Sequence, residues 1–145
     1  MTNILPKMEI NNCSLDQLLE QASQSPRLRQ SKDMRTSAAD SSQRMLNALM
    51  PGTQVPVHRH RLTDETVICL KGKIDEIIFE ETTDAEGNSH LQETARIHLN
   101  PSEGNYGCQV PQNTWHTVEV FEPSVIFEAK DGPYTPATPE DVRNL

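Results

Sequence analysis

The chain lacks any long apolar run, which limits what it can be. Among its 145 residues, no stretch approaches the ~18 consecutive apolar residues of a membrane-spanning helix. The first residues, MTNILPKMEINN, also lack the apolar centre of a signal peptide. Lys and Arg number 13 against 21 Asp and Glu, and the resulting net charge of −8 would repel nucleic acid or an anionic membrane. We therefore expect a cytoplasmic protein with neither kind of partner.

Cysteine is also scarce, with Cys13, Cys69 and Cys108 at wide spacing. An odd number of cysteines without a CxxC pair excludes a simple disulfide framework and disfavours a cysteine-rich zinc site. This pattern is typical of a reducing compartment and agrees with the cytoplasmic prediction.

One helix is predicted near the N-terminus, in the segment SLDQLLEQASQS. Ser14 followed by Gln17 three residues later forms a capping-box pattern. Apolar residues then recur at helical spacing, at Leu15, Leu18, Leu19 and Ala22. We expect a short amphipathic helix that runs to about Ser25 and ends at Pro26.

The rest of the chain predicts short strands. Residues 27–43 are polar and read as a loop with room for one strand. From there to about residue 130, alternating or apolar runs are separated by turns that contain Gly, Pro or Asn. Short strands at close spacing with such turns indicate an all-β sandwich or barrel, and the length suits a single domain. The polar end, TPATPEDVRNL, predicts a surface tail.

A metal site is predicted in the segment PGTQVPVHRHRLTDETVICLKGKI. His58 and His60 are two residues apart, so in a strand they project to the same side, about 6–7 Å apart along the backbone. The turn after them can bring Glu65 back towards the same place. His116 follows the predicted turn PQNTW and opens an alternating strand, which makes it the expected fourth ligand.

Three imidazoles and one carboxylate suit Fe, Mn, Ni, Co or Zn rather than Mg or Ca. A six-coordinate ion held this way would keep two positions for water or substrate, as catalytic sites do. A lone histidine is more often a surface or core residue, so the whole pattern carries the prediction. His90 and His98 lack such partners, and we interpret both as structural or solvent-facing.

This pattern resembles the cupin motifs. The residues Gly52, His58, His60, Glu65 and Gly72 match the first motif, G(X)5HXH(X)4E(X)6G, at every spacing. Pro111 and His116 fit the second motif, G(X)5PXG(X)2H(X)3N. Asn113 replaces its inner glycine and Val120 its final asparagine, and Gly104 lies one residue too early. Asn tolerates positive φ better than most residues, so it can still make the turn.

A closer resemblance, to WbuC-type cupin-fold metalloproteins, covers most of the chain. It rests on SPRLRQ, SSQRMLNALMPGT, VPVHRH, ETVICLKGKI and VIFEAKDGPYTP. That resemblance implies a double-stranded β-helix, or jelly-roll barrel, with a metal site, and a link to bacterial surface-polysaccharide genes. The chain departs from the family pattern after Arg35, where it reads RTSAAD. We expect an N-terminal helix and extension over residues 1–35, a cupin barrel over 36–135 and a tail over 136–145.

Three polar residues are candidates for catalysis. Arg44 lies in an apolar run, where an unpaired charge is costly, so it either enters the pocket to bind an anionic group or pairs with a carboxylate. Glu128 is a candidate general acid or base, or the partner of Arg44. Tyr134 could cover the pocket, although such a tyrosine more often serves packing.

Two functions remain open from the sequence. The first is an enzyme of the isomerase, epimerase or dioxygenase type that acts on a sugar or another small polar molecule. The second is a non-catalytic module that binds or senses a small ligand in the same cavity.

Exposed strand edges and the apolar helix face motivate the hypothesis of a homodimer. Light scattering on the purified protein should give a mass near twice that of the 16.3 kDa chain, and a monomer mass would exclude the dimer.

Overall fold

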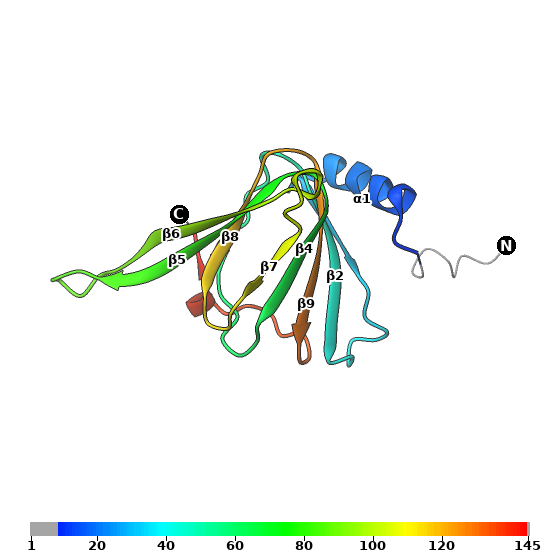
Figure 1. Ribbon diagram of the computed structural model, residues 1–145. Coiled ribbons are helices and arrows are strands. Elements are labelled where there is room, and N and C mark those ends of the chain that lie inside the picture. The colour runs from blue at the N-terminus through cyan, green and yellow to red at the C-terminus, as the bar shows by residue number, and fades with distance from the viewer. Residues whose placement is uncertain (1–8, 145) are drawn as a thin grey trace.

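The computed structural model describes residues 9–144, which form two five-stranded antiparallel sheets, one α-helix and two short 3-10 helices, Pro101–Glu103 and Pro139–Asp141 (Figure 1). The strands of the first sheet lie in the order β1 (Arg29–Asp33), β2 (Ser42–Leu49), β9 (Ser124–Asp131), β4 (Glu65–Lys71) and β7 (Gly107–Val110). Those of the second lie in the order β10 (Val142–Arg143), β3 (Val57–His58), β8 (Trp115–Val120), β5 (Ile74–Thr83) and β6 (Ser89–Leu99). The chain crosses repeatedly between the sheets, and the predicted all-β jelly roll with one short helix is confirmed.

The two sheets enclose an apolar core. In strand β4, buried residues alternate with more exposed ones, so one face of the strand points into this core. Val67 and Cys69 thus face inwards, as does Glu65 two positions earlier. Residues from both sheets complete this cluster, namely Leu49, Ile74, Leu99, Val110, Val120 and Ile126.

The helix α1 (Asn12–Gln24) covers the outer face of the first sheet. Leu15, Leu18 and Ala22 pack there against Leu46, Ala48 and Val125. The apolar helix face is therefore buried within the chain and is no longer an argument for a homodimer, which stays a prediction.

The predicted capping box was wrong by one turn. Asn11 is the N-cap, and its side-chain oxygen accepts a hydrogen bond from the backbone N–H of Ser14. The Ser14 hydroxyl in turn accepts one from the backbone N–H of Asn11. Ser14 is thus the third helical residue rather than the cap, because Asn caps a helix at least as well as Ser does.

The C-terminal segment also differs from the prediction. Residues 139–141 form a 3-10 turn, and β10 then pairs with β3, so Val142 lies opposite His58. Arg59 and Arg61 both bond to the carboxylate of Asp141. The segment predicted as a surface tail therefore borders the strand that carries the first histidine.

The β5–β6 hairpin extends well beyond the barrel (Figure 1). Its far half is polar and exposed, and Asp84 accepts hydrogen bonds from the backbone of the turn. No helix among residues 9–144 is long and apolar enough to cross a membrane.

Two residues with positive φ, Asn113 and Gly72, make tight turns in the barrel. Asn113 adopts φ 61° and donates its backbone N–H to the carbonyl of His60 at 2.6 Å, so the asparagine makes the predicted turn in place of glycine. Gly72, between β4 and β5, has φ +97° and passes close to the backbone before β9. A Cβ at this position would lie 2.5 Å from the carbonyl oxygen of Pro123.

Gly72→Ala should therefore destabilise the protein more than Gly87→Ala does. Both positions have positive φ, which costs alanine roughly 1–2 kcal/mol, but no atom lies within 4 Å of a Cβ at Gly87. The additional clash at Gly72 should add about 1–3 kcal/mol to the loss of unfolding free energy. Urea denaturation of both variants measures this difference, and equal losses would contradict the close approach.

Candidate metal centre

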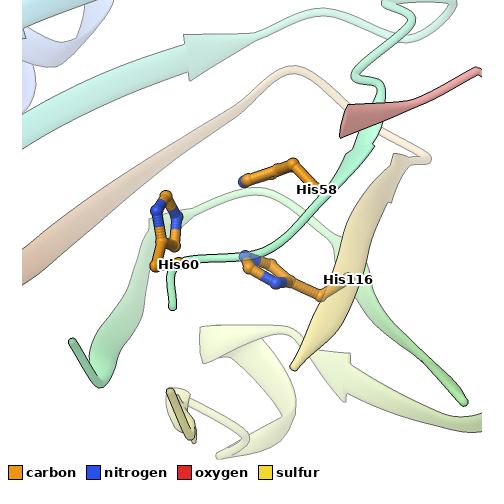
Figure 2. Close-up of side chains that lie close together, drawn as sticks. All are labelled: His58, His60 and His116. Carbon is orange, nitrogen blue, oxygen red and sulfur yellow. The ribbon is translucent and has the colours of Figure 1, made fainter. Parts of the chain in front are cut away.

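Three histidines meet, two from strands of the second sheet and His60 from the loop that follows β3 (Figure 2). His58 ends β3 and lies directly opposite His116 of β8, so the antiparallel register brings the two rings together. Their ring centroids lie 4.3 Å apart, and that of His60 lies 5.1 Å from His58 and 5.5 Å from His116. One nitrogen atom of each ring lies within 4.8 Å of the others, so this cluster could hold a metal ion.

His60 reaches the cluster by a different route from the predicted one. Strand β3 ends at His58, so the shared strand face expected for the two residues does not exist. Instead the carbonyl of His60 accepts the hydrogen bond from the N–H of Asn113, in the turn that precedes His116. The turn of the second motif thus fixes the last histidine of the first motif.

The orientation of two rings is set by backbone carbonyls. Nδ1 of His58 lies 2.9 Å from the carbonyl oxygen of Pro56, and Nδ1 of His116 lies 2.8 Å from that of Thr114. A carbonyl can only accept, so each Nδ1 carries the proton and each Nε2 has a free lone pair. Such outer hydrogen bonds are typical of histidines that bind metals through the other nitrogen.

Both rings are held in the neutral form that a metal needs. Burial lowers the pKa of His58 to about 4, with a further contribution from His116. Burial also lowers the pKa of His116, whose side chain is 2% exposed, although the nearby charge of Glu65 opposes this shift.

Glu65 approaches the histidines from the opposite sheet. Its Oε2 atom lies 3.0 Å from Nε2 of His60 and 3.9 Å from Nε2 of His116. Burial alone would raise the pKa of Glu65, but the two histidines and Lys130, whose Nζ lies 3.7 Å away, outweigh it and hold this pKa below its usual range. The carboxylate is therefore ionised at neutral pH.

Three of these atoms are buried but form no hydrogen bond with any group of residues 9–144. They are Nε2 of His60, Nε2 of His116 and Oε2 of Glu65. The 3.0 Å approach of His60 to Glu65 does not have the alignment of a hydrogen bond. A buried polar atom without a partner costs about 1–3 kcal/mol, and a cation bound among these lone pairs would satisfy all three. The nitrogen and oxygen donors thus fit a divalent transition-metal ion.

The structure adds buried carboxyl groups, one of which the sequence reading missed. Glu76, in β5, is 1% exposed, and its Oε2 has no hydrogen-bond partner in the described part of the chain. Burial raises its pKa well above the usual range, and the charges of Glu65 and Glu128 raise it further. Glu76 and its neighbour Asp75 point to opposite faces of the strand. The segment IDEIIFEE does not reveal which of the two acids faces the interior of the barrel.

Glu128 lies in β9 beside Val67 and faces the interior. Burial raises its pKa to about 8, and the charge of Glu65 contributes, while Lys130 and a hydrogen bond from Asn47 oppose the shift. The amide nitrogen of Asn47 donates to Oε1 of Glu128 at 2.6 Å. Glu128 is therefore mostly protonated at neutral pH, and its partner is Asn47 rather than Arg44.

The other two predicted catalytic residues lie farther out. Arg44 shares the face of β2 that carries Leu46 and Ala48, and its guanidinium donates to Asp40 at 3.0 Å and to the carbonyl of Met34. Arg44 borders the cavity, but its charge is paired with a carboxylate, which was the second of the two predicted alternatives. Tyr134 is 54% exposed and also borders the cavity.

A cavity of about 390 Å³ contains these groups and opens between the sheets. Its inner wall includes His58, Glu65, Glu76, His116 and Glu128. Its volume suits a small molecule rather than a polymer. The remaining histidines lie elsewhere, because His90 pairs with Asp84 in the hairpin and His98 pairs with Asp75 on the outer surface.

One family model matches the chain. It is described as "Domain of unknown function (DUF6016)" and it matches residues 10–91, which is more than half of the chain. The chain therefore belongs to this family. No curated protein matches the sequence.

Solved structures show the same fold at low sequence identity. KdgF from Halomonas sp. is 18% identical, with a TM-score of 0.51 over 77% of this chain and 85% of that chain. Oxalate oxidase in complex with the substrate analogue glycolate is 11% identical, with a TM-score of 0.54 over 79% of this chain and 56% of that chain. CapF with an inhibitor is 15% identical, with a TM-score of 0.52 over 73% of this chain and 29% of that chain. These similarities show that the chain has the cupin fold.

Replacing the protonated carboxyl group of Glu128 should change how stability depends on pH. In metal-free protein, this carboxyl has a pKa of about 8 when folded, against 4.5 for a glutamate in the unfolded chain. At a pH between these two pKa values, Glu128 keeps its proton in the folded state and loses it in the unfolded chain. The contribution of Glu128 to the free energy of unfolding therefore falls as pH rises, by at most ~1.4 kcal/mol per pH unit.

Glu128→Gln removes this contribution and keeps an oxygen that can accept from Asn47. The variant should therefore gain stability relative to the wild type as pH rises from about 5 to about 8. Urea denaturation with a chelator present measures this gain, and Glu122→Gln, at an exposed position, is the control for loss of one carboxyl. A difference from wild type that does not vary with pH would contradict the account.

Proposed function

We propose that this member of the DUF6016 family is a metal-dependent enzyme that acts on a small polar molecule such as a sugar or a related compound. One divalent transition-metal ion (Fe, Mn, Ni, Co or Zn) would be held by His58, His60, His116 and Glu65. The observation that carries this proposal is the group of buried nitrogen and oxygen atoms that form no hydrogen bond within residues 9–144, beside a cavity of small-molecule size.

A bound divalent ion supplies Lewis acidity, which polarises a carbonyl or hydroxyl oxygen of a substrate or acidifies a bound water. Because only one of the four ligands is anionic, much of the positive charge of the ion is kept for a substrate.

The chain itself supplies the proton-transfer groups. Glu128 faces the cavity and holds its proton at neutral pH, because its pKa is about 8. Such a group can donate a proton to a substrate atom and take one back, as a general acid and base with a pKa near the working pH does. Asn47 donates to one oxygen of this carboxyl, and a side-chain hydrogen bond links the carboxyl to Glu65, so both neighbours orient it.

These groups favour the isomerase or epimerase type over the dioxygenase type. Both of the favoured reactions move a proton on the substrate, which is what a protonated carboxyl next to a Lewis acid can assist. A place beside surface-polysaccharide biosynthesis rests on the WbuC-type sequence resemblance alone and forms part of this proposal.

Metal content tests the ligand set. Wild-type protein purified and dialysed against buffer should retain about one divalent ion per chain. His116→Ala and Glu65→Ala should each retain less than about a tenth of that amount, since loss of a ligand weakens binding more than the 10–100-fold effect of losing its outer partner. Inductively coupled plasma mass spectrometry measures this.

His90→Ala is the matched control, because this exposed histidine also pairs with a carboxylate but lies in the hairpin. It should keep the wild-type metal content. Unchanged metal content in both ligand variants would place the ion elsewhere.

A thermal-shift screen of sugars, sugar phosphates and small acids on metal-loaded protein should find a ligand that raises the melting temperature. If that ligand is turned over, Glu128→Gln should lower kcat by about 10²–10⁴-fold while the metal stays bound. A ligand that binds but is never converted would favour the binding or sensing module. Unchanged turnover in Glu128→Gln would remove this residue from the mechanism.

A further inference from the structure

Two arginines differ from all the others in their charge partners. Six of the eight arginines form an ion pair with a carboxylate, namely Arg35, Arg44, Arg59, Arg61, Arg96 and Arg143. Arg27 and Arg29 have no carboxylate partner among residues 9–144. In a chain with a net charge of −8, acidic groups outnumber basic ones, so the absence of a partner for these two is not explained by a shortage of acids.

The position of Arg29 follows from the register of β1, which forms one edge of the first sheet. Arg29 lies opposite Leu49 and Ser31 lies opposite Asn47, so the odd-numbered residues of this strand share the inner face with them. Both arginines border the cavity that contains the histidine cluster, as do Ser31 and other odd-numbered positions, Asp33 and Arg35. The strand alternation thus turns Arg29 towards the cavity and Lys32 towards the opposite face. Arg27 lies in the turn before β1, where Leu28 has φ 55°, and it borders the same cavity.

The guanidinium group of Arg29 lies in an unfavourable electrostatic environment. Arg29 is half-buried, and burial lowers its pKa first, with the positive charge of Arg27 as the second cause. One nitrogen of Arg29, Nη1, donates to the carbonyl oxygen of Gln54 at 3.2 Å, which orients the guanidinium without neutralising it. Arg27 is exposed, so the pair lies at the outer end of the cavity.

We propose that Arg27 and Arg29 form an anion-binding subsite at the outer end of this cavity, so that the substrate carries a carboxylate or a phosphate group. The planar guanidinium donates two parallel hydrogen bonds to either anion, and a bound anion removes the repulsion between the two arginines. The inner end of the cavity would then hold the reacting part of the molecule beside the histidines. In this last respect the inference rests on the proposed function.

The experiment uses metal-free protein, so that it does not depend on the metal site. Inorganic phosphate, malonate and neutral glycerol are titrated separately at constant ionic strength, and the side-chain N–H signals of arginine are followed by ¹H–¹⁵N NMR. The signal of Arg29 should shift with phosphate or malonate and stay unchanged with glycerol. Comparison of the two anions shows whether the subsite prefers phosphate or carboxylate.

Arg29→Gln and Arg27→Gln should each raise the Kd for the preferred anion by about 10-fold or more, since each removes charge-assisted hydrogen bonds. Lys32→Gln is the matched control, because it removes one positive charge from the same strand but on the opposite face, and it should leave the Kd within about twofold of wild type. Both arginine variants should keep the wild-type melting temperature without anion, or exceed it, since repulsion is relieved.

Three results would overturn this inference: no shift of Arg29 with either anion, equal weakening by Lys32→Gln, or unchanged binding in both arginine variants. The proposed function and this inference can fail independently. If the protein binds an anion but retains no metal, the subsite stands and the proposed metal-dependent enzyme is contradicted. If it retains the metal but binds no anion, the subsite is contradicted and the proposed metal site stands.

Discussion

The structure depends on the burial of polar atoms that form no hydrogen bond within residues 9–144. Nε2 of His60, Nε2 of His116 and Oε2 of Glu65 lie together away from water, and the protein forgoes about 1–3 kcal/mol for each of them. Nearby backbone carbonyls do not supply hydrogen bonds to these atoms. The carbonyls of Pro56 and Thr114 accept the Nδ1 protons and so leave the Nε2 atoms bare. A cation that binds all of these lone pairs is the one addition that satisfies them together.

The same site concentrates carboxyl groups in a small volume. Glu65 is ionised, whereas burial and the charge of Glu65 keep Glu76 and Glu128 protonated. Lys130 lies 3.7 Å from Glu65 and offsets part of its charge. Carboxyls that differ in this way suit different tasks, since an ionised one can bind a cation and a protonated one can donate a proton. Towards the outer end of the cavity the sign changes, because Arg27 and Arg29 border it there.

Much of this could be predicted from spacing, because a cupin barrel repeats its strand–turn–strand pattern along the chain. The spacing between Gly52 and Gly72 predicted that His58 and His60 belong to one cluster. The run from Pro111 to His116 predicted a turn, and Asn113 in that turn has positive φ. The inward alternation of β4 followed from its pattern as well. These features are local, and local sequence determines them.

Features that depend on pairing between distant strands could not be predicted. Glu76 alternates with Asp75, and only the register with β8 decides which of them is inside. Arg27 and Arg29 lie in a polar segment that reads as a loop, until pairing with β2 makes part of it an edge strand. His60 joins the cluster through a hydrogen bond to Asn113, which is 53 residues away in the chain. The two-residue strand β10 is too short to leave any pattern.

X-ray absorption spectroscopy of the metal-loaded protein tests the central claim most directly, because it reports which atoms bind the ion. The account predicts about three imidazole ligands and further oxygen ligands at roughly 2.0–2.2 Å, with no sulfur, for zinc in the site. The imidazole signal should weaken by about a third in a His58→Gln variant that is loaded in the same way. A sulfur ligand, or a shell made of oxygen atoms alone, would contradict the assignment of this cluster as the metal site.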